Sequence, residues 1–217
     1  MCRATETVGA LLAARPSQQG KCRVLLVGCL ALLLLGCSPA RPTEQVAVYT
    51  ASVRALYPQA LQVAREWRTD AYLVFVHTDF AVAGQGEKNL FSTFTFSSLT
   101  TPAFELTLIY EPATDSFETS LSGYGPERRL RLAIAEDEWP VDSTMALEIA
   151  QASGGADFLS RASQNLSLHM SLEKGPVEGT QVTYWLVYYA DWTKLEGLCL
   201  TIHAGTGAVI SRKCKSE

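Results

Sequence analysis

The sequence predicts an α+β fold made of two repeats, each with a helix packed on an antiparallel sheet of three to four strands. A segment with helical spacing of apolar residues precedes a series of strand-like runs, and this order occurs twice along the chain. The two helical segments also match in sequence, as Ala60-Leu-x-Val-Ala64 and Ala146-Leu-x-Ile-Ala150. Helices that precede groups of strands, without strict alternation, are typical of antiparallel sheets covered on one face.

The first repeat is expected to span residues 44–135. Pro58 suits the first position of a helix that runs to Trp67, because a backbone N–H at that position has no partner within the helix and proline has no N–H to satisfy. Apolar residues at helical spacing then mark one face of this helix. The strand-like runs that follow lie at 71–76, 91–96 and 104–110.

The second repeat is expected to span residues 136–217. Asp142-Ser-Thr is an N-cap cluster that opens a helix over Met145–Ala150. This helix either ends at Gly154-Gly155 or resumes after it, through 156–162. The strand-like runs that follow lie at 166–172, 181–189, 197–203 and 208–213.

Residues 1–36 have the features of a bacterial secretory signal, and residues 1–20 look like an over-extended start. Lys21 and Arg23 precede thirteen uncharged residues, too few to span about 30 Å of hydrocarbon as a helix. This run ends in Leu34-Leu35-Gly36-Cys37, which resembles a lipobox. We therefore expect cleavage before Cys37, lipidation of that cysteine, and a tether over 37–43. The protein would be membrane-anchored outside the cytoplasm, at the outer membrane if the host has one, because Ser38 follows the lipidated residue.

Composition indicates a folded, moderately acidic domain. The chain of 217 residues is 47% apolar and 18% charged. Residues 1–37 hold four of the 18 basic and one of the 22 acidic residues, which leaves 14 basic and 21 acidic residues and a net charge near −7. No basic cluster is longer than Arg128-Arg129-x-Arg131, so we expect no nucleic-acid partner.

Two cysteines, Cys199 and Cys214, lie beyond the lipobox and flank two β-rich runs around Gly205-Thr206-Gly207. A two-residue turn at Thr206-Gly207 would place Cys199 directly opposite Cys214. A three-residue turn with Gly207 left-handed would shift the register by one residue, still near bridging distance. We expect a cross-strand disulfide in an oxidising compartment, and two free thiols are the alternative.

The second half resembles a PepSY domain over about 70 residues, 142–212. The likeness lies in Asp142-Ser-x-x-Ala146-Leu-x-Ile-Ala150 and in the hairpin Leu200-Thr-Ile-His-Ala-Gly-Thr-Gly-Ala-Val-Ile210. The family hairpin usually reads apolar-x-apolar-Asp-Ala-x-Thr-Gly-x-Val-apolar, so His203 stands in place of the usual Asp. The first half would be a degenerate copy, with Glu111-Pro-Ala-Thr-Asp115 where the hairpin should be.

The resemblance implies small α+β modules without catalytic residues of their own, found in secreted and membrane-anchored bacterial proteins. Binding or inhibition of extracytoplasmic partners, peptidases among them, has been proposed for such modules. We accordingly expect no catalytic residue and no cofactor. The function we expect is a lipid-anchored, non-catalytic module that binds or inhibits an envelope or secreted protein. The alternative is a structural or assembly lipoprotein of the cell envelope; the sequence does not fix the oligomeric state.

The three histidines, His77, His169 and His203, are isolated in the sequence. His77-x-Asp79 would place two side chains on one face of a strand, which is a conceivable half of a metal site. Zinc normally takes three or four ligands, and the sequence identifies no third ligand. We therefore expect a solvated pair and no metal site.

An aromatic run, Tyr184-Trp-Leu-Val-Tyr-Tyr189, alternates between the two faces of a predicted strand. One set of side chains should line the core beneath the helix. The other set either forms an aromatic patch for partner contact or packs between the repeats. Trp185 and Tyr189 are the candidate partner-binding residues.

Overall fold

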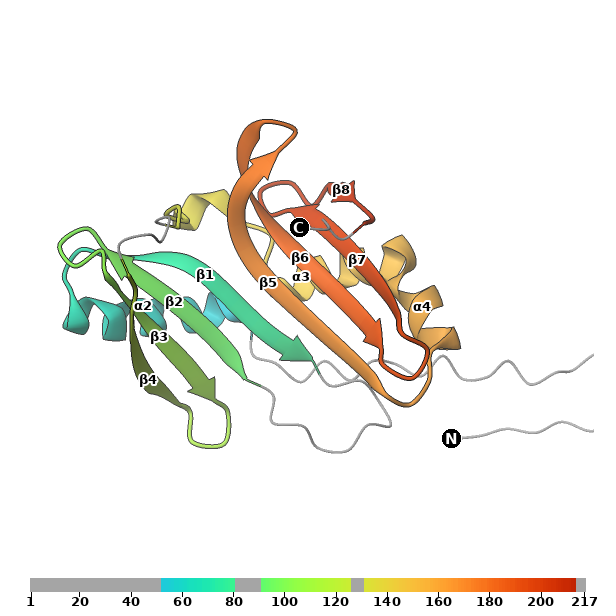
Figure 1. Ribbon diagram of the computed structural model, residues 1–217, viewed down its shortest axis with the longest axis horizontal. Helices are drawn as coiled ribbons and strands as arrows, with labels where there is room; N and C mark the ends of the chain where they lie inside the picture. The colour runs from blue at the N-terminus through green and yellow to red at the C-terminus, as the bar shows by residue number, and fades with distance from the viewer. Residues whose placement is uncertain (1–51, 81–90, 126–130, 214–217) are drawn as a thin grey trace, which may run out of the picture. The chain divides into compact units, whose positions relative to one another are not determined.

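The computed structural model describes residues 52–80, 91–125 and 131–213. These residues belong to one compact unit, Glu44–Glu217, in which all eight described strands form a single antiparallel sheet (Figure 1). The predicted α+β class and antiparallel pairing are confirmed.

The helices are α2 (Val53–Trp67), α3 (Ser143–Ala150) and α4 (Ala156–Arg161), and a 3₁₀ turn, Glu136–Glu138, precedes α3. The strands are β1 (Ala71–Phe80), β2 (Ser92–Ser98), β3 (Phe104–Glu111), β4 (Ser116–Gly123), β5 (Leu166–Val177), β6 (Thr180–Asp191), β7 (Glu196–His203) and β8 (Val209–Ser211).

The strand order across the sheet is β4-β3-β2-β1-β5-β6-β7-β8. Strands β1 and β5, distant in sequence, are therefore hydrogen-bonded neighbours in the middle of the sheet. α2 contacts β1, β2 and β3, whereas α3 contacts β6 and β7. Both helices lie behind the sheet in the view of Figure 1, so the face toward the viewer is the one that they leave uncovered.

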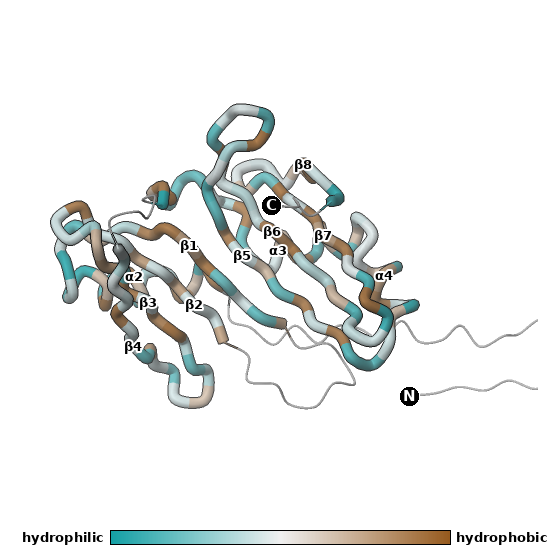
Figure 2. The backbone as a smooth tube through the Cα atoms, viewed as in Figure 1, coloured by the Kyte–Doolittle hydropathy of each residue, from teal (hydrophilic) through white to brown (hydrophobic). Residues whose placement is uncertain are grey.

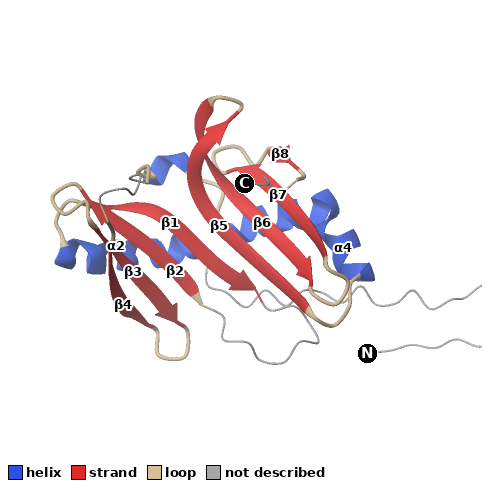
Figure 3. Cartoon of the chain, in the orientation of Figure 1, coloured by secondary structure: helices blue, strands red, loops and turns tan. Residues whose placement is uncertain are grey.

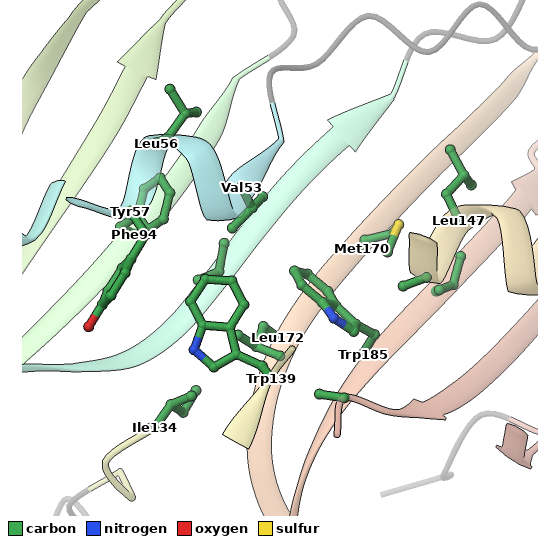
Figure 4. Close-up of a cluster of buried hydrophobic side chains, with 14 of the residues drawn as sticks. Val53, Leu56, Tyr57, Phe94, Ile134, Trp139, Leu147, Met170, Leu172 and Trp185 are labelled. Atoms are coloured by element: carbon green, nitrogen blue, oxygen red, sulfur yellow. The ribbon is translucent and has the colours of Figure 1, made fainter. Parts of the chain in front are cut away.

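The core lies between these helices and the sheet. Along β1, β3, β5 and β6 buried residues, most of them apolar, largely alternate with more exposed ones. Figure 2 shows hydrophobic residues interspersed with hydrophilic ones along the strands. This pattern is expected when one face of an antiparallel sheet packs on helices and the other does not. Figure 4 shows the centre of the core, where Trp139 contacts Tyr57 of α2 on one side and Trp185 of β6 on the other.

α2 begins earlier than predicted. Its first residue is Val53, and Ser52 is the N-cap, with its Oγ accepting a hydrogen bond from the Ala55 N–H at 3.1 Å. Pro58 lies inside the helix instead of starting it. An internal proline removes one helical hydrogen bond. The prediction of Pro58 as the first residue was wrong, because Ser52 and residues from elsewhere in the chain hold the first turn of the helix, before Pro58.

Those contacts come from the segment that leads into α3. The Arg54 N–H donates to Asp142 Oδ1 at 2.9 Å, and the Val53 N–H donates to Ser143 Oγ at 3.2 Å. Asp142 stands at the N-cap position of α3, as predicted, but its side chain makes no capping bond to that helix. It caps α2 instead, which joins the two halves of the chain at their helix starts.

Two alternatives left open by the sequence are decided in the second half. The helix resumes after Gly154, whose φ of 124° interrupts it, and continues as α4. In the last hairpin Gly207 is left-handed, with φ 75°, and Thr201 pairs with Ser211. This is the register of the three-residue turn, one residue away from direct opposition of the two cysteines.

In the first half, the segment at Glu111–Asp115 does form a turn, between β3 and a fourth strand, β4. Asp115 there takes a left-handed conformation, with φ 48°. The first half thus has four strands, the upper end of the three to four that the sequence predicted.

Candidate functional site

Three polar side chains converge on the uncovered face of the sheet, at its centre. His77 and Asp79 come from β1, and His169 comes from the adjacent β5, where it pairs directly with Asp79. Because side chains alternate along a strand, His77 and Asp79 share a face opposite to the buried Val76, Thr78 and Phe80. Register and alternation together bring the three side chains to one point. We call them the His–Asp–His cluster.

Asp79 is the centre of this cluster. Its Oδ1 lies 2.6 Å from His169 Nδ1 and 3.2 Å from His77 Nε2. The side chains of His77, Asp79 and His169 are 32%, 20% and 34% exposed, so each is partly covered but open to solvent. One carboxylate oxygen therefore accepts from two imidazoles on neighbouring strands.

The electrostatics keep Asp79 ionised. Burial alone would raise the pKa of its carboxyl group, but the hydrogen bonds and positive charge from His169 and His77 hold that pKa well below its usual range. At neutral pH the cluster thus presents an anionic oxygen beside two imidazole nitrogens. These are the donor types that divalent transition-metal ions prefer.

Aromatic rings extend from the cluster in a row across the sheet. His77 lies 5.9 Å from His169 between ring centroids, and His169 stacks on Tyr188 of β6 at 6.3 Å with an interplanar angle of 13°. On the other side His77 contacts Phe91 at 6.5 Å. These contacts restrict the orientation of both imidazole rings. We call this row, Phe91–His77–His169–Tyr188, the aromatic row.

The structure brings His77 and Asp79 together, as the sequence predicted, but as part of a larger group than a solvated pair. The member of the cluster that the sequence did not reveal is His169. Its only signal in the sequence is its place on a strand facing the same side as His77 and Asp79. Recognising it requires the pairing of β1 with β5. His203 lies apart from the cluster, on β7, where its Nδ1 accepts from the Gly205 N–H at 2.9 Å.

Trp185 and Tyr189 are not available to a partner, and their assignment as partner-binding residues was wrong. Both are fully buried, on the side of β6 that faces the helices. The Trp185 indole N–H donates to the Val141 carbonyl at 2.7 Å, and the Tyr189 ring packs against Phe158 of α4. The complementary set, Tyr184, Leu186 and Tyr188, is partly exposed on the other side of β6. That side belongs to the uncovered face, because the helices lie behind the sheet in Figure 3.

The predicted lipidation site and part of the predicted disulfide lie outside the described residues. Cys37 and Cys214 are both in this category, whereas Cys199 is buried on β7. Lipidation and the Cys199–Cys214 bridge therefore stay predictions. Within the described ranges, no helix has both the length and the hydrophobicity needed to cross a bilayer.

No protein-family model and no curated protein matches this chain. Among solved structures, the chain is similar to a predicted lipoprotein from Clostridium difficile 630, with a TM-score of 0.50 and 14% sequence identity. The match covers 72% of this chain and 91% of that protein. At this identity the likeness shows a shared fold, and the PepSY resemblance continues to rest on the helix start and hairpin of the second half.

Proposed function

We propose that this protein is a lipid-anchored, non-catalytic binding module outside the cytoplasm, and that the uncovered face of its sheet contacts a protein partner. The observation that carries the proposal is the aromatic row, flanked by the partly exposed Tyr184 and Leu186. Aromatic side chains with a polar edge are enriched in protein interfaces because they bury a large area at a small entropic cost. A face of this composition suits a partner with its own apolar and polar side chains.

The anchoring part of the proposal rests on the lipobox. The structural neighbour is itself a predicted lipoprotein, which agrees with a lipid anchor on Cys37. Replacing Cys37 by Ser should release the protein from membranes or leave it unprocessed. A Cys37→Ser protein that stays membrane-bound with normal size and lipid content would contradict this part.

The strand order supports a second aspect of the proposal, that the module arose from two repeats. A helix followed by four strands occurs twice, and the order β4-β3-β2-β1 is mirrored by β5-β6-β7-β8. The matched alanines, Ala60 and Ala64 in α2 and Ala146 and Ala150 in α3, are all fully buried. Small residues at the same helical positions allow both helices to pack closely on the sheet.

A photo-crosslinking experiment tests the binding face. A photoreactive amino acid is placed at Leu186, on the uncovered face, in the membrane-anchored protein within intact cells. The matched control carries it at Met145, which is 50% exposed on α3. We expect a discrete protein adduct from position 186 and none from position 145.

Adducts of equal yield at both positions, or adducts with lipid alone at position 186, would reject the binding face. A partner identified as a component of envelope assembly would favour the structural role over inhibition of a secreted enzyme.

A further inference from the structure

We propose that His77, Asp79 and His169 form a binding site for a divalent transition-metal ion such as Zn²⁺. This inference does not depend on the proposed protein partner, because all three ligands belong to this chain. Their donor atoms lie within 4.8 Å of one another. Two imidazole nitrogens and a carboxylate oxygen make a ligand set that zinc adopts in sites with an open coordination position.

The two distances from Asp79 Oδ1 to the imidazole nitrogens are close to what a tetrahedral ion requires. Zinc binds His nitrogen and Asp oxygen at about 2.0–2.2 Å, which places two tetrahedral ligands roughly 3.3 Å apart. His77 Nε2 and Asp79 Oδ1 are already separated by 3.2 Å. His169 Nδ1 and Asp79 Oδ1 are 2.6 Å apart and need to separate by roughly 0.7 Å to admit the ion. Small side-chain rotations of partly exposed residues suffice for this.

The site is held by two paired strands in the middle of the sheet. β1 and β5 pair through five consecutive positions from Val76–Leu172 to Phe80–Leu168, and both are internal strands. The imidazole rings are further restricted by the aromatic row, in which each contacts a neighbouring ring. Ligands that keep their places without the ion give up less conformational entropy when it binds.

A hydrogen-bonded triad is the alternative to a metal site, and the two differ in where the protons lie. In the triad, His77 Nε2 and His169 Nδ1 carry the hydrogens that Asp79 accepts. When the ion binds, these nitrogens donate their lone pairs to the metal. In each neutral ring the proton then sits on the other nitrogen. The two rings change tautomer and the carboxylate exchanges two hydrogen bonds for one metal bond.

All three side chains of the site are partly exposed to solvent. The ion can enter from solvent, and at least one coordination position remains open toward the uncovered face. A water molecule, or a carboxylate or imidazole from another molecule, is the natural fourth ligand. The site is therefore of the open type and not a closed structural one.

The three histidines of the chain make the test direct, because two belong to the site and the third, His203, is an internal reference. The mature full-length protein is titrated with ZnCl₂, and the imidazole resonances are followed by NMR. We expect saturation at one ion per chain, with shifts of the His77 and His169 resonances to the metal-bound tautomers and an unchanged His203 resonance. Replacing Zn²⁺ by Co²⁺ should give the visible absorption of a tetrahedral site without a thiolate-to-cobalt band.

Matched variants complete the test. His169→Gln and Asp79→Asn should each weaken Zn²⁺ binding by about tenfold or more, since even loss of groups that only orient metal ligands costs 10–100-fold. His203→Gln should leave binding unchanged. Equal Zn²⁺ affinity in wild type and His169→Gln would overturn the proposal, as would a shift of His203 alone or a thiolate band. The wild-type titration involves no substitution, so a variant that fails to fold cannot obscure the outcome.

Discussion

At the scale of single residues, Tyr189 is a polar side chain on the buried side of β6. Its side chain is fully buried, and its hydroxyl has no hydrogen-bond partner among the described residues. Burial raises the pKa of this hydroxyl well above its usual range, so it stays neutral. Gly155 leaves the space that the hydroxyl occupies, since a Cβ there would lie 2.4 Å from it. The ring and hydroxyl of Tyr189 therefore fit the space, but the hydroxyl oxygen makes no hydrogen bond to the described residues.

Tyr189→Phe should therefore raise the free energy of unfolding by about 1 kcal/mol, because it removes a buried polar group that lacks a partner. Tyr110→Phe is the control. The Tyr110 hydroxyl donates to Asp115 Oδ1 at 2.8 Å, so its loss should lower the free energy of unfolding by about 1 kcal/mol. Urea denaturation measures both values. A loss of stability in Tyr189→Phe would contradict the prediction and indicate an ordered water at the hydroxyl.

The sequence divided the aromatic run into two sets correctly but could not tell which set is buried. Both sets contain aromatic side chains, and period-two alternation has no preference between the faces of a sheet. The choice follows from where α3 and α4 pack, with Trp185 donating to the Val141 carbonyl and Tyr189 meeting Phe158. These contacts are tertiary, and local sequence does not encode them.

At the scale of elements, the starts of the helices depend on each other. Asp142 was recognised in the sequence as an N-cap residue, but the helix whose amide it satisfies is α2. Asp142→Ala should lower the free energy of unfolding by about 2 kcal/mol, because the Arg54 N–H is left without its acceptor. Asp137→Ala, at an exposed acid in the preceding 3₁₀ turn, should stay within about 0.5 kcal/mol of wild type. Thermal or urea unfolding distinguishes the two; equal effects would reject the capping role.

A second carboxylate ties a loop to a turn at one end of the second half. Asp191, at the end of β6, accepts from the Ser163 N–H and hydroxyl at 2.7 and 2.6 Å. It also accepts from the Thr193 and Lys194 N–H groups at 3.0 and 3.1 Å. Burial opposes its ionisation, but these hydrogen bonds prevail and lower its pKa from 3.8 to about 2.

The depressed pKa of Asp191 predicts an acid-dependent contribution to stability. A carboxyl group whose pKa is lower in the folded state stabilises it above the unfolded pKa near 4, and this contribution disappears as the pH falls through about 2. Asp191→Asn should therefore be less stable than wild type at pH 6, and the difference should shrink between pH 4 and pH 2. Denaturation at a series of pH values checks this. A difference that does not change with pH would show that the amide and the carboxylate are equivalent there.

At the scale of the whole molecule, one core joins both halves. Trp139, in the segment between them, contacts Tyr57 of α2 at 5.4 Å and Trp185 of β6 at 6.4 Å between ring centroids. Together with the β1–β5 pairing, this contact makes the two halves one structural unit. The sequence indicated the order of elements within each half because that order follows from local periodicity. It did not indicate that β1 of one half pairs with β5 of the other, because this pairing is non-local. For the same reason it did not indicate the contact between His169 and Asp79.

The shared core predicts that the two halves unfold together. Because Trp139 contacts both halves, its loss should destabilise both of them. Trp139→Ala should cost about 3–5 kcal/mol, the usual range for loss of a buried large aromatic side chain. Trp192→Ala, at an indole that is 53% exposed, should cost far less, because surface substitutions stay near 0.5 kcal/mol. Amide hydrogen exchange in β2 and β6 reports each half separately. Equal loss of protection in both strands of Trp139→Ala is the expected result, whereas loss confined to one strand would mean that the halves unfold independently and that the joint at β1 and β5 does not couple them.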